Sequence, residues 1–262
     1  MHISGNDFSQ RLLERTVDKF QSLMGIGSGS DVESSGEKVI IGTLQRTFTP
    51  PYVIFDVGSN RGQFLKLVLQ NLLREDFNIH CFEPGRETFR QLAETCGPDH
   101  RIILNNIGLG KEKGETCLYY DAPGSVLASL TKRRLNHFGI PFHQSENVKI
   151  TAVDDYCREK NIKKIDLLKI DVEGHELDVL YGAENMIRDD AVGMISFEFG
   201  GCNIDTRSFF QDFYYFFTGY GMSIFRITPS GYLYPIVSYK EIFEQFRTTN
   251  FLAIRRSSYT VE

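Results

Sequence analysis

The sequence predicts an α/β protein in which a mostly parallel β-sheet carries helices on both faces. From residue 52 onward, short apolar segments typical of buried strands alternate with segments whose apolar residues recur at helical spacing. The chain has 262 residues, of which 41% are hydrophobic and 24% are charged. These values are typical of a globular protein that is long enough to bury one full core, and they exclude a disordered or fibrous chain.

We expect residues 1–48 to form an N-terminal helix followed by a flexible linker. Residues 7–24 carry apolar side chains near helical spacing, and Asp7 is placed to cap this helix. Residues 25–37 are rich in Gly and Ser, which favours a surface linker; the alternative is a mobile segment that folds over a bound ligand. The domain that contains the sheet then spans residues 49–262.

The first part of the sheet is predicted from strands and helices that alternate up to residue 107. Each strand is a short apolar run that ends in polar or small residues, and each helix has an apolar face. The strands are residues 52–58, 78–84 and 101–107, and the helices are residues 63–73 and 86–96.

The alternation is interrupted between residues 110 and 150. Two segments with strand character, residues 115–121 and 148–153, are separated by a long irregular loop. A loop of this length is usually functional or mobile, so we expect residues 121–147 to determine the substrate that the protein accepts. Its basic and aromatic mixture suits an acidic or phosphorylated sugar, but it is equally typical of a solvated basic loop. The side chains concerned are Lys132, Arg133, Arg134, His137, Phe138, Phe142 and His143.

The alternation then resumes to the end of the chain. The last two strands are expected to form the antiparallel edge of the sheet. Aromatic residues surround the helix at residues 209–217 almost completely, which predicts burial on more than one side; the alternative is a dimer contact. The strands are residues 165–172, 192–200, 222–228, 232–237 and 250–256, and the helices are residues 175–187 and 207–220.

A glycine-containing loop follows the first strand and is the first candidate binding site. Ligands of open α/β sheets bind beyond the carboxyl ends of the strands. Gly58 and Gly62 allow a tight turn, and the free N–H groups of the next helix favour a carboxylate or phosphate. Asn60 stands where a dinucleotide fingerprint has its second glycine, which argues against NAD or FAD.

The second and third strands end in residues that fit a nucleoside. Glu83 ends the second strand, where an acidic side chain is placed to bind two ribose hydroxyls, and Pro84 ends that strand. After the third strand, Asn106, Gly108 and Leu109 suit a slot for a flat base, whose edge Asn106 could hydrogen-bond. A plain Asn-Gly turn is the alternative for this last segment.

Acidic residues also follow the fourth and fifth strands. Asp171 should point into the same crevice as Asp56, and two carboxylates there favour a ligand with positive charge. Glu198 ends the fifth strand and is placed to contact a substrate or to act as a base, although it could equally be a helix cap or a paired carboxylate. His175 follows Asp171 as a further candidate catalytic residue, although a lone histidine is more often structural.

Composition excludes several classes of partner and location. The net charge of −5 argues against a protein whose main role is to bind nucleic acid. No apolar run is long enough for a transmembrane segment or a secretory signal. The five cysteines include no pair in C-x-x-C spacing, which favours free thiols and a cytoplasmic protein without a disulfide framework. Asp171, Glu173 and Glu198 have no recognisable metal spacing, so we expect no metal.

These motifs together resemble the FkbM-type family of S-adenosylmethionine-dependent methyltransferases. The matching segments are FDVGSNRG, FEP, NIGLG, VDDYC, LLKIDVEGHE and ISFEFG, and the resemblance covers about residues 50–256. It implies a Rossmann-like class I methyltransferase fold with a seven-stranded sheet. It also implies O-methylation of a hydroxyl on a sugar, glycan or secondary metabolite.

The resemblance also assigns parts of the cofactor to residues. It implies that the loop with Asp56, Gly58, Ser59, Asn60 and Gly62 holds the methionine end of S-adenosylmethionine, and that Glu83 holds the ribose. It further implies that the NIGLG turn lies beside the adenine. Asp171 would lie near the amino group or the methyl-transfer centre.

Two other functions stay open on the sequence alone. One is a nucleotide-sugar oxidoreductase or epimerase that uses NAD, and the other is a catalytically inactive cofactor-binding protein. For a methyltransferase, His175 is the expected general base because an unperturbed imidazole titrates near pH ~6.5. Asp171 is expected to be ionised beside the cationic cofactor, and Glu198 is the next candidate for the base.

Overall fold

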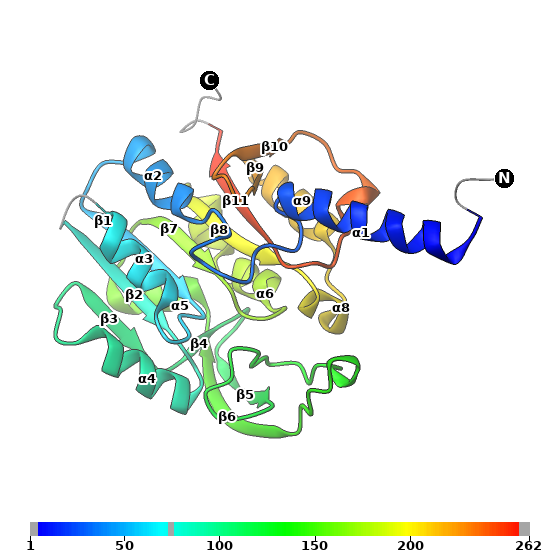
Figure 1. The fold of residues 1–262 in the computed structure, drawn as a ribbon. Helices are drawn as coiled ribbons and strands as arrows, with labels where there is room; N and C mark the ends of the chain where they lie inside the picture. The colour runs from blue at the N-terminus through cyan, green and yellow to red at the C-terminus, as the bar shows by residue number, and fades with distance from the viewer. Residues whose placement is uncertain (1–4, 73–75, 257–262) are drawn as a thin grey trace.

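The computed structural model describes residues 5–72 and 76–256 and shows a central eight-stranded sheet (Figure 1). The strand order is β10-β9-β11-β8-β7-β1-β2-β3, and β3, β2, β1, β7 and β8 pair in parallel. The predicted fold class is therefore confirmed. The strands are β1 (Tyr52–Val57), β2 (Phe77–Phe82), β3 (Ile102–Asn105), β7 (Ile165–Ile170), β8 (Val192–Phe199), β9 (Met222–Ile227), β10 (Leu233–Ile236) and β11 (Thr249–Arg255).

The antiparallel part of the sheet differs from the expectation. The last strand, β11, lies between β8 and β9 and is antiparallel to both, so it does not form an edge with β10. Every residue of β11 is buried, which agrees with a position inside the sheet. The short strand β10, which was predicted at residues 232–237, pairs with β9 and forms the edge, so the sheet has one strand more than the seven that the family resemblance implied.

Two hydrophobic clusters, one on each side of the sheet, contain the core. Side chains from α2, α3 and α4 form one cluster with the strands, and side chains from α5, α6, α7 and α9 form the other. The predicted helix at residues 175–187 is divided into α6 and α7. The helices are α2 (Lys38–Thr47), α3 (Gln63–Asn71), α4 (Arg86–Cys96), α5 (Val153–Lys160), α6 (Glu176–Gly182), α7 (Glu184–Arg188), α8 (Cys202–Thr206) and α9 (Phe210–Gly219).

Helix α9 contributes one face of its aromatic sequence to this core. Phe210, Phe213 and Phe217 are fully buried, whereas Phe209 and Tyr215 are exposed. Tyr214 and Phe216 are partly buried against the same core, so five of the seven aromatic side chains of residues 209–217 are at least partly buried. The predicted helix at residues 63–73 ends at Asn71, and Leu73 lies outside the described residues.

A second, three-stranded sheet lies below the carboxyl ends of the first strands (Figure 1). It consists of β4 (Gly108–Leu109), β6 (Gln144–Thr151) and β5 (Gly114–Tyr120), in that order. The two strands expected around the long loop are confirmed as β5 and β6. Residues 144–147, which were assigned to the loop, belong to β6, and the loop contains the short 3-10 helix η1 (Asn136–Phe138).

The N-terminal region contains more regular structure than the single helix and flexible linker that were expected. Helix α1 (Asp7–Leu23) is present, but Asn6 caps it instead of Asp7, because the Asn6 side chain accepts from the Ser9 N–H at 2.9 Å. Helix α2 was not expected, and its Ile40, Ile41 and Leu44 are buried against the sheet. Residues 25–37, which we call the strap, lie against the start of β11. There the Gly29 N–H donates to the Thr248 carbonyl oxygen at 3.0 Å.

The sheet topology places the ends of β1 and β7 side by side. The chain runs from β1 through β2 to β3 on one side of β1, and then returns to β7 on the other side. Such a reversal of strand order opens a crevice at the carboxyl ends of the two strands. Among the described residues, no helix combines the length and apolarity needed to cross a membrane.

Candidate active site

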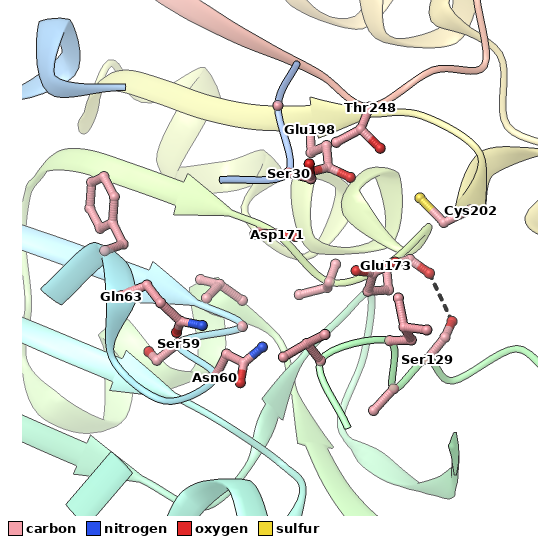
Figure 2. Close-up of a pocket in the computed structure, with 18 of the residues that line it drawn as sticks. Ser30, Ser59, Asn60, Gln63, Ser129, Asp171, Glu173, Glu198, Cys202 and Thr248 are labelled. Carbon is pink, nitrogen blue, oxygen red and sulfur yellow. Dashed lines mark hydrogen bonds between the residues drawn. The ribbon is translucent and has the colours of Figure 1, made fainter. Parts of the chain in front are cut away.

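A cavity of about 800 Å³ lies at the carboxyl ends of β1, β2, β7 and β8 (Figure 2). The loops after these strands contribute to its wall, together with the strap and residues 125–130 of the long loop. Figure 2 shows Ser59, Asn60 and Gln63 at one end and Glu198, Ser30 and Thr248 at the other, with Asp171 between them. The cavity thus has two ends with different chemistry.

Gly58 allows the loops after β1 and β7 to approach closely. It has a φ of +79°, and a Cβ atom there would lie 1.8 Å from the carbonyl oxygen of Asp171. No other amino acid fits both the backbone conformation and the space. The glycine at position 58 of this motif is therefore required because the loops after β1 and β7 cross there.

Glu83 connects the loops after β1 and β2. One carboxylate oxygen accepts from the Gly85 N–H at 2.9 Å, and the other accepts from the Asn60 N–H at 3.0 Å. The side chain is almost fully buried and lines the cavity, and burial raises its pKa to about 7. Each oxygen has a further lone pair, so the carboxylate can still accept from ligand hydroxyls.

Ser59 and Asn60 line the same end of the cavity. The Ser59 hydroxyl donates to the Asp56 carbonyl oxygen at 2.7 Å, which holds the turn closed. Asn60 has a left-handed backbone with a φ of +48°. Its side-chain oxygen is buried and, within the part of the chain that the structure describes, has no hydrogen-bond partner. Because unpaired buried polar atoms are rare, this oxygen points to a ligand that donates a hydrogen bond.

Lys169 occupies the centre of a buried group of charges. Its ammonium lies 3.1 Å from Asp171 Oδ2 and 3.7 Å from Asp56 Oδ1. Burial alone would lower the pKa of Lys169, but the carboxylates of Asp171 and Asp56 outweigh burial and raise it. The lysine is therefore charged, and it offsets the negative charge where β1 and β7 meet.

The other end of the cavity is formed by carboxylates from β8 and the loop after β7. Glu198 lines the cavity, and burial together with the neighbouring charge of Asp171 raises its pKa well above the ordinary value. Burial and Asp171 also raise the pKa of Glu173 to about 8. Arg133 of the long loop reaches this carboxylate, with Nη1 at 2.5 Å from Glu173 Oε2. The Glu173 carbonyl oxygen accepts from the Ser129 hydroxyl at 2.8 Å (Figure 2).

The structure brings most of the predicted site residues to the cavity. Those that line it are Gly58, Ser59, Asn60, Glu83, Pro84, Gly108, Leu109, Asp171 and Glu198. Four predicted residues, Asp56, Gly62, Asn106 and His175, are not part of the lining. Asp56 is completely buried and faces Lys169. The Asn106 amide donates to the backbone oxygens of Glu83 and Pro84, so it supports the loop after β2.

His175 is held beside the cavity by two hydrogen bonds. Its Nε2 lies 2.9 Å from the Thr131 hydroxyl, and its Nδ1 lies 2.7 Å from Asp178 Oδ2. Both ring nitrogens are thus occupied by residues of the protein. This placement connects the start of α6 to the long loop and does not favour His175 as the group that contacts a substrate.

The strap contributes residues that the sequence motifs did not indicate. Ser30, Asp31, Glu33 and Glu37 line the cavity, so the interpretation of residues 25–37 as only a surface linker was wrong. Glu37 is almost fully buried, and burial raises its pKa to about 7. The one sequence signal was the Gly- and Ser-rich composition, which is equally typical of a segment that folds over a ligand.

Comparison with known proteins shows the family of the chain. Residues 56–224, more than half of the chain, match the methyltransferase FkbM domain. The chain is 28% identical over 179 residues to the 2-O-methyltransferase NoeI of Sinorhizobium fredii. This alignment covers 64% of this chain and 72% of that protein. It is 27% identical over 154 residues to the hexuronic acid methyltransferase AglP of Haloferax volcanii, covering 58% of this chain and 59% of that protein.

Solved structures with similar folds are more distant in sequence. The methyltransferase FkbM of Methylobacillus flagellatus aligns with a TM-score of 0.47 and 15% identity, covering 92% of this chain and 59% of that one. The plantazolicin methyltransferase BpumL, solved with SAH, aligns with a TM-score of 0.45 and 10% identity, covering 97% and 93%. None of these comparisons supports an NAD-dependent oxidoreductase or epimerase. The chain belongs to the FkbM family of methyltransferases, which confirms the resemblance found in its motifs, and it is an S-adenosylmethionine-dependent methyltransferase.

Proposed function

We propose that the protein transfers a methyl group from S-adenosylmethionine to a hydroxyl group of a sugar or glycan. The observation that carries this proposal is the two-ended cavity, in which groups that suit a nucleoside lie at one end and carboxylates lie at the other. Its volume of about 800 Å³ lies in the upper part of the range for small-molecule sites. The O-methylation in the name of NoeI and the hexuronic acid in the name of AglP support this substrate class.

The residues at the first end fit the cofactor. The free side-chain oxygen of Asn60 suits a donor such as the cofactor's amino group, and Glu83 suits two ribose hydroxyls. Pro84, Gly108 and Leu109 form a small, apolar wall that suits a flat base. When bound, S-adenosylmethionine supplies a methyl group on a positively charged sulfur, and the carboxylate of Asp171 is placed to stabilise that charge.

At the second end, the chain's own residues would orient the acceptor and remove its proton. An aliphatic hydroxyl is a weak nucleophile, and a general base contributes typically ~10²–10⁴-fold in rate. Glu198 lines the cavity, and its raised pKa makes it a stronger base than an ordinary carboxylate. We therefore assign the role of base to Glu198 in preference to His175, whose ring nitrogens are both hydrogen-bonded outside the cavity lining.

The structure also narrows the acceptor that the long loop would recognise. Of its basic and aromatic residues, Arg133 and Phe138 line the cavity. Arg133 contacts Glu173 and lies 3.9 Å from Asp205, so it already has partners within the protein. Arg133 is the one basic residue of this loop that lines the cavity, and we propose that these carboxylates hold it in place while the loop recognises the acceptor through its hydroxyl groups.

Transfer of a labelled methyl group to a panel of sugars and glycans tests this function. We expect Glu198→Gln to lose at least 100-fold in turnover while it keeps the affinity for S-adenosylhomocysteine, because a general base supplies ~10²–10⁴-fold. His175→Ala should keep most of its turnover. If His175→Ala alone abolished transfer, the base would be His175. If the protein bound the cofactor but no hydroxyl compound accepted the label, it would be a cofactor-binding protein without this activity.

Two further expectations belong to the same proposal. We propose a cytoplasmic enzyme without a nucleic-acid partner. The five cysteines are free thiols, as in proteins of reducing compartments, and the net charge is −5.

In residues 5–72 and 76–256, no cluster of three or more His, Cys, Asp or Glu side chains is arranged to hold a metal ion. Turnover that continues in the presence of a chelator would agree with a metal-independent reaction.

A further inference from the structure

Helix α1 turns its apolar face away from the protein. It projects from the body of the molecule (Figure 1), and none of its residues is buried. Its large apolar side chains are between 46% and 78% exposed, and Met24, directly after the helix, is 42% exposed. These residues, which we call the α1 face, are Phe8, Leu12, Leu13, Val17, Phe20, Leu23 and Met24.

The polar side of α1 makes the contacts with the rest of the chain. Arg247 Nη1 lies 2.7 Å from Asp18 Oδ1 and also donates to the Gln21 side-chain oxygen at 2.5 Å. The Gln21 amide donates to the side-chain oxygen of Gln245 at 2.6 Å. A surface helix ordinarily packs its apolar stripe on the core, so this orientation is the reverse of the usual one. The α1 face is therefore available to a partner.

A groove lined by apolar, aromatic and polar residues, the last being Arg226, Thr228 and Ser230, continues from the α1 face. It has a volume of about 450 Å³ and contains Leu23 and Met24 at the end of α1. Across from them lie Tyr232 and Tyr234, which are 60% and 42% exposed. A convex apolar helix and a partly aromatic groove thus lie next to each other on one surface. This combination suits a two-fold dimer, in which the same surface must fit itself.

The size of the surface agrees with a dimer interface. With side chains of roughly 150–200 Å² each and the exposed fractions above, the α1 face presents on the order of 700 Å². A stable interface buries about 800 Å² per partner, whereas monomeric proteins rarely expose a contiguous apolar patch of more than a few hundred Å². The two tyrosines of the groove add the remaining area.

The charges of α1 favour a protein partner over a membrane. The helix carries Asp7, Glu14 and Asp18 against Arg11, Arg15 and Lys19, so its net charge is zero. Helices that bind anionic membranes usually carry an excess of Lys and Arg on the polar face. We propose that the α1 face and its groove bind a second copy of this chain, so that the protein is a dimer assembled through α1.

Sedimentation of the full-length protein over a wide range of concentration tests the proposal. We expect the wild-type protein to be a dimer. The double substitution Leu12→Gln and Phe20→Gln should raise the dissociation constant of this dimer by about 100-fold or more, because it removes two large apolar contacts. Leu69→Gln, on the exposed side of α3, is the matched control and should leave the dimer intact. A wild-type monomer at all concentrations, or a dimer that survives the double substitution, would overturn the proposal.

Disulfide cross-linking provides a second measurement, which reports the side of α1 that faces the second copy. Thr16 lies on the same side of α1 as the α1 face, near the middle of the helix, whereas Glu14 lies on the polar side. Under mild oxidation, Thr16→Cys should form a covalent dimer and Glu14→Cys should not. Equal cross-linking of both variants would contradict the proposal. So would a monomer that binds vesicles of phosphatidylcholine and phosphatidylglycerol through Leu12 and Phe20, because the occupant would then be a membrane.

Discussion

Replacing Gly58 with alanine should damage both stability and cofactor binding, because two loops cross at this residue. The φ of Gly58 is +79°, a left-handed conformation that costs an L-residue roughly 1–2 kcal/mol. The new Cβ would also lie 1.8 Å from the Asp171 carbonyl oxygen and 2.8 Å from its carbonyl carbon. These are backbone atoms, so relief of the clash requires the loops after β1 and β7 to move apart.

The magnitude follows from adding the two effects. Overpacking of a well-packed site typically costs ~1–3 kcal/mol, so together with the backbone conformation we expect a loss of about 2–5 kcal/mol in the free energy of unfolding. Gly221 provides a matched control, since its φ is +70° and a Cβ there would meet no atom within 4 Å. Gly221→Ala should therefore cost only the conformational part, about 1–2 kcal/mol.

Urea unfolding of the two variants, followed by calorimetric titration with S-adenosylhomocysteine, separates the effects. We expect Gly58→Ala to be the less stable variant and to lose most of its cofactor affinity, whereas Gly221→Ala keeps the wild-type affinity. Equal stabilities of the two variants would refute the argument, because the clash with Asp171 would then have no energetic consequence. If Gly58→Ala kept the wild-type affinity, the crossing of the two loops would have no part in cofactor binding.

Three further predictions concern charges and the long loop. Burial raises the pKa of Glu83 from 4.5 to about 7, so its contribution favours folding at low pH and is lost as pH rises from about 4.5 to 7. Between pH 4.5 and 7, the free energy of unfolding should fall more steeply with pH for the wild type than for Glu83→Gln. Lys169→Met should cost about 3–5 kcal/mol, since it leaves the buried carboxylate of Asp56 without a cation. Adding Asp56→Asn should restore part of this loss, and an additive result would contradict the pairing. Replacement of residues 131–141 by a short Gly-Ser link should reduce acceptor turnover but not cofactor affinity, and unchanged turnover would exclude the loop from acceptor recognition.

Local sequence patterns were sufficient to predict most of the strands and the loops after β1 and β2 that line one end of the cavity. A buried parallel strand requires a short apolar run, and its carboxyl end is marked by the first polar or glycine residues, such as Asp56-Val57-Gly58 and Glu83-Pro84. Because all parallel strands end on the same edge, these motifs had to converge. The sequence therefore determined the fold class and the family, and it indicated nine of the residues that line the cavity.

The remaining features depend on contacts between distant segments, which local patterns do not contain. In the sequence, Lys169 is simply one polar residue within a predicted strand. Only the structure shows that its ammonium lies near the carboxylates of Asp56 and Asp171 and offsets their charge. His175 follows the β7 motif directly, yet Thr131 and Asp178 hold its ring beside the cavity.

Helix α1 and strand β11 show the same limit. The amphipathic pattern of α1 predicts a helix with an apolar side but cannot state whether the body of the protein covers that side. The position of β11 between β8 and β9 depends on which edges are free when the last strand joins the sheet. Tertiary structure decided these points because burial and pairing belong to the assembled chain, whereas propensity and periodicity belong to each segment alone.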